Sequence, residues 1–139
     1  IAYAYLFTYF PKEAWRTQRL VKELLEKYYH NSPSGIPGND DTGAMSAWAI
    51  YSMLGFYPDC PGSTSYALTT PVFDKVTIHL DSKYYKQPKL VIHKGAAGAE
   101  RGDYFTQIQV ANKLYSNKYR LTHAELTGAG ELRYLTQPK

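Results

Sequence analysis

The sequence predicts an α+β fold, with helices in the first half of the chain and short strands in the second. Two observations support this prediction. Apolar residues recur at helical spacing over residues 12–30 and 45–54. The second half contains short segments rich in β-branched and aromatic residues, separated by turn-forming residues. The 139 residues are 44% hydrophobic, which suits one ordinary globular domain or a piece of a larger one.

The helical half begins with an apolar, aromatic run over residues 1–9, which we expect to be the end of a buried helix that stops before Pro11. Because a domain seldom opens with such a run, we expect the chain to be a fragment of a longer one. An amphipathic helix is predicted over residues 12–30, followed by a loop of Pro, Gly and Ser at 31–38. The expected apolar face of this helix consists of Trp15, Leu20, Val21, Leu24, Leu25 and Tyr28.

A second helix is predicted over residues 45–54, and its apolar side chains are expected in the core. Residues 39–42, Asn-Asp-Asp-Thr, are all types that cap helix N-termini. Gly55 is a suitable stop at the other end, with Pro58 shortly after it.

The β half carries the whole basic surplus of a chain with 16 Lys and Arg against 12 Asp and Glu. Its lysines are scattered along the sequence, which favours a solvated sheet surface over a nucleic-acid-binding face. A flexible connection is expected at the glycines of residues 95–102. The predicted strands are residues 66–68, 75–80, 89–93, 106–110 and 132–136.

The strongest chemical feature is the pair Asp40 and Asp41 at the start of the second helix. The N–H groups at a helix N-terminus favour negative charge, so a carboxylate there stays ionised at neutral pH, as a general base requires. The simpler alternative is an N-cap followed by an acid in the first turn. Spacing alone leaves both interpretations open and favours the simpler one.

The remaining candidates are weaker. None of the four histidines has a partner at zinc-binding spacing, although His79 and His93 could face each other across two strands. The lone Cys60 rules out an internal disulfide and is expected to be a plain small side chain. No apolar run is long enough to span a membrane. The residues themselves therefore predict no metal site and no membrane span.

Several segments, in order along almost the whole chain, resemble glycoside hydrolase family 92, the calcium-dependent exo-acting α-mannosidases. The most specific is Gly-Asn-Asp-Asp-Thr-Gly-Ala-Met-Ser-Ala-Trp at residues 38–48. The other segments that resemble the family are residues 14–18, 54–63, 71–80, 121–123 and 130–132.

The resemblance implies an architecture in which residues 1–65 are the last helices of an (α/α)6 catalytic barrel and residues 66–139 an antiparallel, β-rich C-terminal region. It also implies hydrolysis of terminal α-linked mannose with inversion, which needs a general acid and a general base. The family's base lies in the acidic block before the Met-Ser-Ala-Trp helix. Carried over, it falls on Asp41, with Asp40 as the fallback. Asn39 stands where the family often has another acid, and it is expected to contact the sugar.

The resemblance further implies that the general acid and the main ligands of a Ca²⁺ cofactor lie before Ile1, so we expect this polypeptide alone to be inactive. Its expected partners are mannose-containing glycans, an N-terminal β-sandwich and the rest of the barrel. Family members are usually secreted, periplasmic or cell-surface proteins. Two alternatives stay open: a non-catalytic carbohydrate-binding or structural β-module, and a basic nucleic-acid binder.

Overall fold

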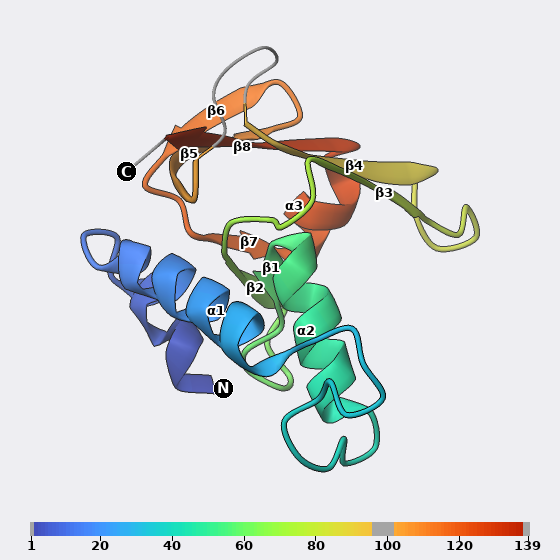
Figure 1. Cartoon of the computed structure of the whole chain (residues 1–139). Coiled ribbons are helices and arrows are strands. Elements are labelled where there is room, and N and C mark those ends of the chain that lie inside the picture. Colours follow the sequence, from blue (N-terminus) through green and yellow to red (C-terminus); the bar gives the residue numbers. More distant parts are fainter. Residues whose placement is uncertain (1, 96–101, 138–139) are drawn as a thin grey trace.

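The computed structural model describes residues 2–95 and 102–137 and confirms the mixed helix-and-sheet class (Figure 1). Most of the expected connection at residues 95–102 lies outside the described residues. The helices are η1 (Ala2–Tyr9), α1 (Ala14–Tyr28), α2 (Ala44–Leu54) and α3 (His123–Gly128). The strands are β1 (Phe56–Tyr57), β2 (Ser65–Leu68), β3 (Lys75–His79), β4 (Lys89–Lys94), β5 (Tyr104–Val110), β6 (Lys113–Ser116), β7 (Arg120–Thr122) and β8 (Glu131–Gln137).

The strands form two sheets. A three-stranded sheet has the order β1-β2-β7, and a five-stranded sheet has the order β3-β4-β8-β5-β6. The expectation of an antiparallel region is wrong at one place, because β4 and β8 pair in parallel, with Ile92 opposite Leu132. These two strands are far apart in sequence, and the chain between them supplies β5, β6, β7 and α3. All other described strand pairs are antiparallel.

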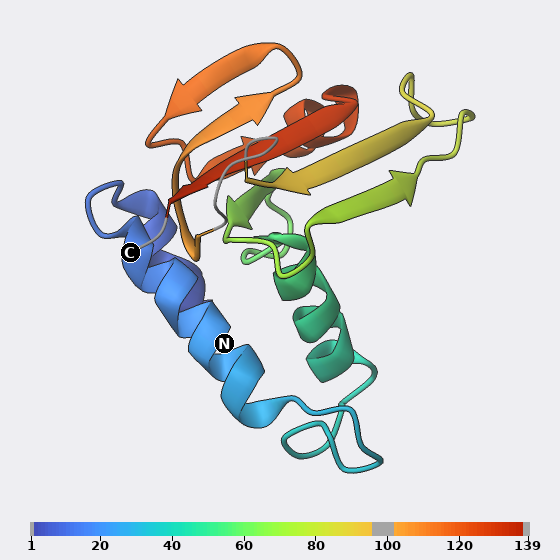
Figure 2. The same ribbon diagram turned by 45° about the horizontal axis from the view of Figure 1, so that its top comes forward.

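The helices lie on one side of the five-stranded sheet (Figure 1). In Figure 2, α1 runs away from that sheet, the loop over residues 29–43 reverses the chain at the far end, and α2 runs back towards the sheet. The N-terminus of α2 therefore lies at the end of the molecule remote from the five-stranded sheet. The described helices include none that is both long and apolar enough to cross a membrane.

The first segment was predicted to be the end of a buried helix, and this is wrong in part. It forms η1, a 3₁₀-helix in which one row of side chains is exposed. Residues three apart eclipse each other in this helix. Tyr5 and Thr8 accordingly form a buried row, whereas Tyr3, Leu6 and Tyr9 form an exposed one, with Tyr3 84% exposed. An apolar run thus becomes a half-buried element.

Helix α1 is slightly shorter than predicted. Val21 and Leu25 are buried and Leu20 and Leu24 pack partly buried against the core, as predicted, but the rest of the buried face differs. Trp15 and Tyr28 are exposed, and the buried row consists of Ala14, Thr17, Gln18, Val21 and Leu25. Gln18 is buried because its side chain pairs with both backbone groups of Phe105 on β5. Gln18 Nε2 donates to the Phe105 carbonyl at 3.0 Å, and the Phe105 N–H donates to Gln18 Oε1 at 2.8 Å. This pairing joins α1 to the sheet.

Helix α2 ends as predicted, at Gly55 with φ 97°. The buried Tyr134 on β8 donates its hydroxyl hydrogen to the Gly55 carbonyl at 2.9 Å, which links the helix end to the sheet. The prediction that every apolar side chain of α2 is in the core is wrong for Ile50, which is exposed. The main core lies between the helices and the sheet and includes Leu90, Ile92, Phe105, Ile108, Leu132 and Tyr134.

Candidate active site

The acidic block lies in a turn with unusual backbone geometry. Asp41, Thr42 and Gly43 have φ values of 43°, 61° and 83°, so three successive residues are left-handed. This conformation costs a residue other than glycine about 1–2 kcal/mol and is least expected for a β-branched one. Since such strain persists only where the surroundings enforce it, the turn is a candidate functional feature.

The Asp40 carboxylate binds the first turn of α2. Oδ1 accepts hydrogen bonds from the N–H groups of Met45 at 2.9 Å and Ser46 at 2.8 Å, and Oδ2 accepts one from the Ser46 hydroxyl at 2.7 Å. These bonds, led by those from Ser46, lower the pKa of the Asp40 carboxyl below its ordinary value. The predicted capping role of the acidic block is therefore confirmed for Asp40, although the N-cap residue is Gly43.

Asp41 has the opposite surroundings. It is exposed, and its side chain has no hydrogen bond or ion pair to any other described residue. Asn39, two residues earlier, is also exposed. The turn thus brings the three predicted site residues together, with one carboxylate engaged by the helix and the other available to a ligand. A carboxylate in contact with solvent can accept a proton from water, as a general base must.

The described residues do not by themselves fit a calcium ion. Among them, no group of three or more His, Cys, Asp or Glu side chains could hold a metal. Both Asp40 oxygens already accept hydrogen bonds from α2, whereas Ca²⁺ takes 6–8 oxygen ligands.

The histidines and the cysteine add no further site. His79 and His93 do not face each other, because the β3–β4 register pairs His79 with Lys89 and His93 with Lys75. Cys60 is an exposed free thiol.

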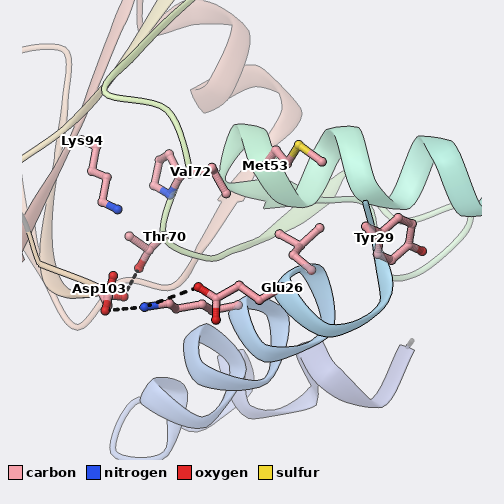
Figure 3. A pocket seen from close by; sticks show the side chains of 10 residues that line it. Glu26, Tyr29, Met53, Thr70, Val72, Lys94 and Asp103 are labelled. Carbon is pink, nitrogen blue, oxygen red and sulfur yellow. Dashed lines mark hydrogen bonds and ion pairs between the residues drawn. The ribbon is translucent and has the colours of Figure 1, made fainter. Parts of the chain in front are cut away.

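A separate cavity of about 370 Å³ lies between α1, α2 and the segment after β2 (Figure 3). Lys22 Nζ bridges Asp103 at 2.6 Å and Glu26 at 3.8 Å, and the Thr70 hydroxyl donates to the Asp103 carbonyl at 2.8 Å. These polar groups satisfy one another, and none of the predicted site residues lines the cavity. Its apolar walls are Leu25, Met53, Pro71 and Val72. We therefore place the candidate site at the turn before α2.

Sequence reasoning missed one member of this site, Ser46, whose side chain and N–H both bind Asp40. A six-residue separation between an acid and a serine follows no common capping rule. The one available signal was Gly43, since a glycine directly before a helix leaves the first-turn N–H groups to another side chain.

Comparison with known proteins finds similarity along almost the whole chain. Residues 1–138 match the family model of the glycosyl hydrolase family 92 catalytic domain. A stretch of 74 residues is 31% identical to an uncharacterized secreted glycosidase of Arthroderma benhamiae, covering 53% of this chain and 9% of that protein.

Two solved structures from Bacteroides thetaiotaomicron resemble nearly the whole chain. One is a family GH92 α-mannosidase in complex with mannoimidazole, with a TM-score of 0.84 and 28% identity over 99% of this chain. The other is a family GH92 inverting mannosidase, with a TM-score of 0.79 and 32% identity over 99% of this chain. The chain spans 17% and 18% of their respective lengths.

Proposed function

The chain belongs to glycosyl hydrolase family 92, and from this we propose that it is the C-terminal segment of an α-mannosidase. The enzyme would release terminal α-linked mannose from glycans by a single displacement that inverts the anomeric carbon. One of the two similar Bacteroides thetaiotaomicron proteins is an inverting mannosidase, which supports this choice.

The observation that carries the proposal is the contrast between the two adjacent carboxylates. Asp40 is engaged by α2, whereas Asp41 is exposed and its side chain has no partner among the described residues. In the proposed reaction, the Asp41 carboxylate removes a proton from a water molecule while the oxygen of that water attacks the anomeric carbon. The bond to the leaving oxygen breaks, and a general acid outside this chain protonates that oxygen. The exposed amide of Asn39 would hydrogen-bond a sugar hydroxyl beside the base.

We propose that residues 1–65 belong to an (α/α)6 barrel and residues 66–139 to a β-rich C-terminal region. The surface of α2 supports the first part of this proposal. The sequence of α2 contains no charged residue, yet Ile50 is 58% exposed and Ala47 is also exposed. A helix that is apolar on all sides is normally buried within a larger protein. Neighbouring barrel helices and an N-terminal β-sandwich would cover this face.

We also propose, from the resemblance to family 92, that the complete enzyme uses Ca²⁺ held mainly by residues outside this chain. We assign no step of the reaction to the ion. A similar protein from Arthroderma benhamiae is described as a secreted glycosidase, which supports a secreted, periplasmic or cell-surface location.

The test is mannose release from an α-mannoside, with and without a calcium chelator. We expect no release by this chain alone and chelator-sensitive release by a complete family 92 catalytic domain that carries it. Proton NMR of the first product should show β-mannose, since inversion of an α-linkage gives the β-anomer. Sugar binding without release, unaffected by the chelator and by loss of Asp41, would instead indicate a non-catalytic carbohydrate-binding module.

A further inference from the structure

The turn before α2 is held by a side chain that is not the N-cap residue of the helix. An ordinary N-cap side chain lies directly before the helix and accepts hydrogen bonds from the N–H groups of its second or third residue. Here the N-cap is Gly43, which has no side chain. The N–H groups of Met45 and Ser46 donate instead to Asp40, three residues further back. The Ser46 hydroxyl binds the other carboxylate oxygen.

This attachment determines the path of the residues between Asp40 and the helix. The Asp40 carboxylate holds Asp40 close to the first turn of α2. The three residues between them, Asp41, Thr42 and Gly43, must connect these two points over a short distance, and all three have left-handed φ values. The Ala44 N–H donates to the Asp41 carbonyl at 3.3 Å, and the Ser46 hydroxyl also lies 3.3 Å from the Gly43 carbonyl. A left-handed threonine is unfavourable without an external restraint. The Asp40 contacts provide such a restraint, because they span the turn.

We propose that Asp40 is a positioning residue, whose contacts with Met45 and Ser46 fix the left-handed turn that presents Asp41 to the reacting water. This inference rests on the proposed function, since it takes Asp41 as the general base. It also replaces the fallback assignment of Asp40 as the base, because its carboxylate already accepts three hydrogen bonds.

The energetic reason for such a residue is the sensitivity of catalysis to geometry. A displacement of about 1 Å can reduce turnover by about 10²-fold. Asp41 has no side-chain contact of its own among the described residues, so its position depends on the backbone that carries it. Releasing that backbone is expected to lower kcat while leaving the Michaelis constant nearly unchanged.

The first experiment uses this chain and does not depend on activity. A residue with positive φ has a short distance between its amide and α hydrogens, so Asp41 and Thr42 should give strong intraresidue NOEs. We expect Asp40→Ala to weaken both NOEs and to speed hydrogen exchange at Ser46, whereas the Met45 N–H keeps its 3.3 Å hydrogen bond to the Asp40 backbone carbonyl. Asp40→Asn keeps one carbonyl oxygen for the two N–H groups and should preserve most of the signal. Unchanged NOEs in Asp40→Ala would overturn the proposal.

The second experiment measures kcat and the Michaelis constant in a complete family 92 catalytic domain that carries this segment. We expect Asp40→Ala to lower kcat by about 10²-fold and Asp40→Asn to restore it to within about tenfold of wild type. The matched control is Thr122→Ala, which removes the capping box of α3 and should leave kcat unchanged.

The outcomes separate the two proposals. If Asp40→Asn is as inactive as Asp41→Asn, Asp40 is itself the base and its positioning role is wrong. Wild-type kcat in Asp40→Ala would equally overturn that role. If the wild-type domain releases no mannose, the proposed function fails together with the positioning role that rests on it. The NOEs then still show whether Asp40 holds the turn.

Discussion

Arg120 on β7 and Asp59, just after β1, form a bidentate ion pair, and their side chains are 16% and 7% exposed. The pair consists of Nη2 to Oδ1 at 2.7 Å and Nη1 to Oδ2 at 3.0 Å. Arg120 also donates to the hydroxyls of Thr8 and Ser65, and its guanidinium carbon lies 4.1 Å from the centre of the Tyr9 ring. One side chain thus joins η1 to the three-stranded sheet.

Removing Asp59 should destabilise the protein strongly. Asp59→Ala leaves the largely buried guanidinium without its counter-ion, a loss that typically costs about 3–5 kcal/mol of unfolding free energy. Urea denaturation followed by circular dichroism measures this cost. The matched control is Glu23→Ala, which removes the ion pair to Arg19, whose partners are 49% and 56% exposed. It should cost less than about 1 kcal/mol. Equal effects would show that the Arg120 pair is not a structural link.

Gly55 should tolerate no side chain. Its φ is 97°, and an added Cβ would lie 2.7 Å from Pro71 Cγ and 3.1 Å from the Thr69 carbonyl oxygen. Backbone strain and overpacking together predict that Gly55→Ala lowers the unfolding free energy by about 2–4 kcal/mol. Gly62→Ala is the control, because its φ is also positive but its Cβ would meet no atom within 4 Å. Thermal unfolding in which both variants behave alike would contradict the predicted clash.

Patterns local in sequence predicted much of the fold. Helical periodicity located α1 and α2, Gly55 marked the end of α2, and alternation located five strands. The sequence alone did not predict β1 or β6, which are only two and four residues long. It also missed α3, although Thr122 and Glu125 have the spacing of a capping box and form one.

Contacts distant in sequence explain the remaining errors. The parallel pairing of β4 with β8 depends on the path of the chain between them, which no local pattern specifies. Gln18 is buried because it binds the backbone of Phe105, 87 residues away. At the candidate site, the acidic block was predictable from composition. The division of roles between Asp40 and Asp41 required the hydrogen bonds to Ser46.

The Asp40 carboxyl should titrate below the ordinary aspartate value of 3.8, because hydrogen bonds from Ser46 and Met45 stabilise its charged form. A pKa lowered on folding means that the unfolded state binds the proton more readily. The stabilisation is therefore fully present above the unfolded value and is lost as the pH falls through the folded one.

Ser46→Ala removes one of these bonds, so the Asp40 midpoint should move up towards the ordinary value. Carboxyl ¹³C NMR measures this shift, and the unfolding free energies of variant and wild type should converge as the pH falls below 3.8. Glu125, whose pKa is lowered chiefly by Lys118, is the internal control and should not move. An unchanged Asp40 midpoint in Ser46→Ala would mean that the serine contacts do not stabilise the charge.

Asp41→Asn should separate catalysis from folding and binding. An amide has the shape of the carboxylate but cannot accept the proton of the attacking water, so kcat should fall by about 10²–10⁴-fold in a complete catalytic domain. Asparagine tolerates the left-handed conformation, and the exposed side chain loses no contact to the described residues. Stability should therefore change by less than about 0.5 kcal/mol, and calorimetry should show undiminished binding of a non-hydrolysed mannoside.

The control for Asp41→Asn is Asp81→Asn, which removes an exposed carboxylate from the turn between β3 and β4 and should retain full turnover. Full turnover in Asp41→Asn would show that Asp41 is not the base.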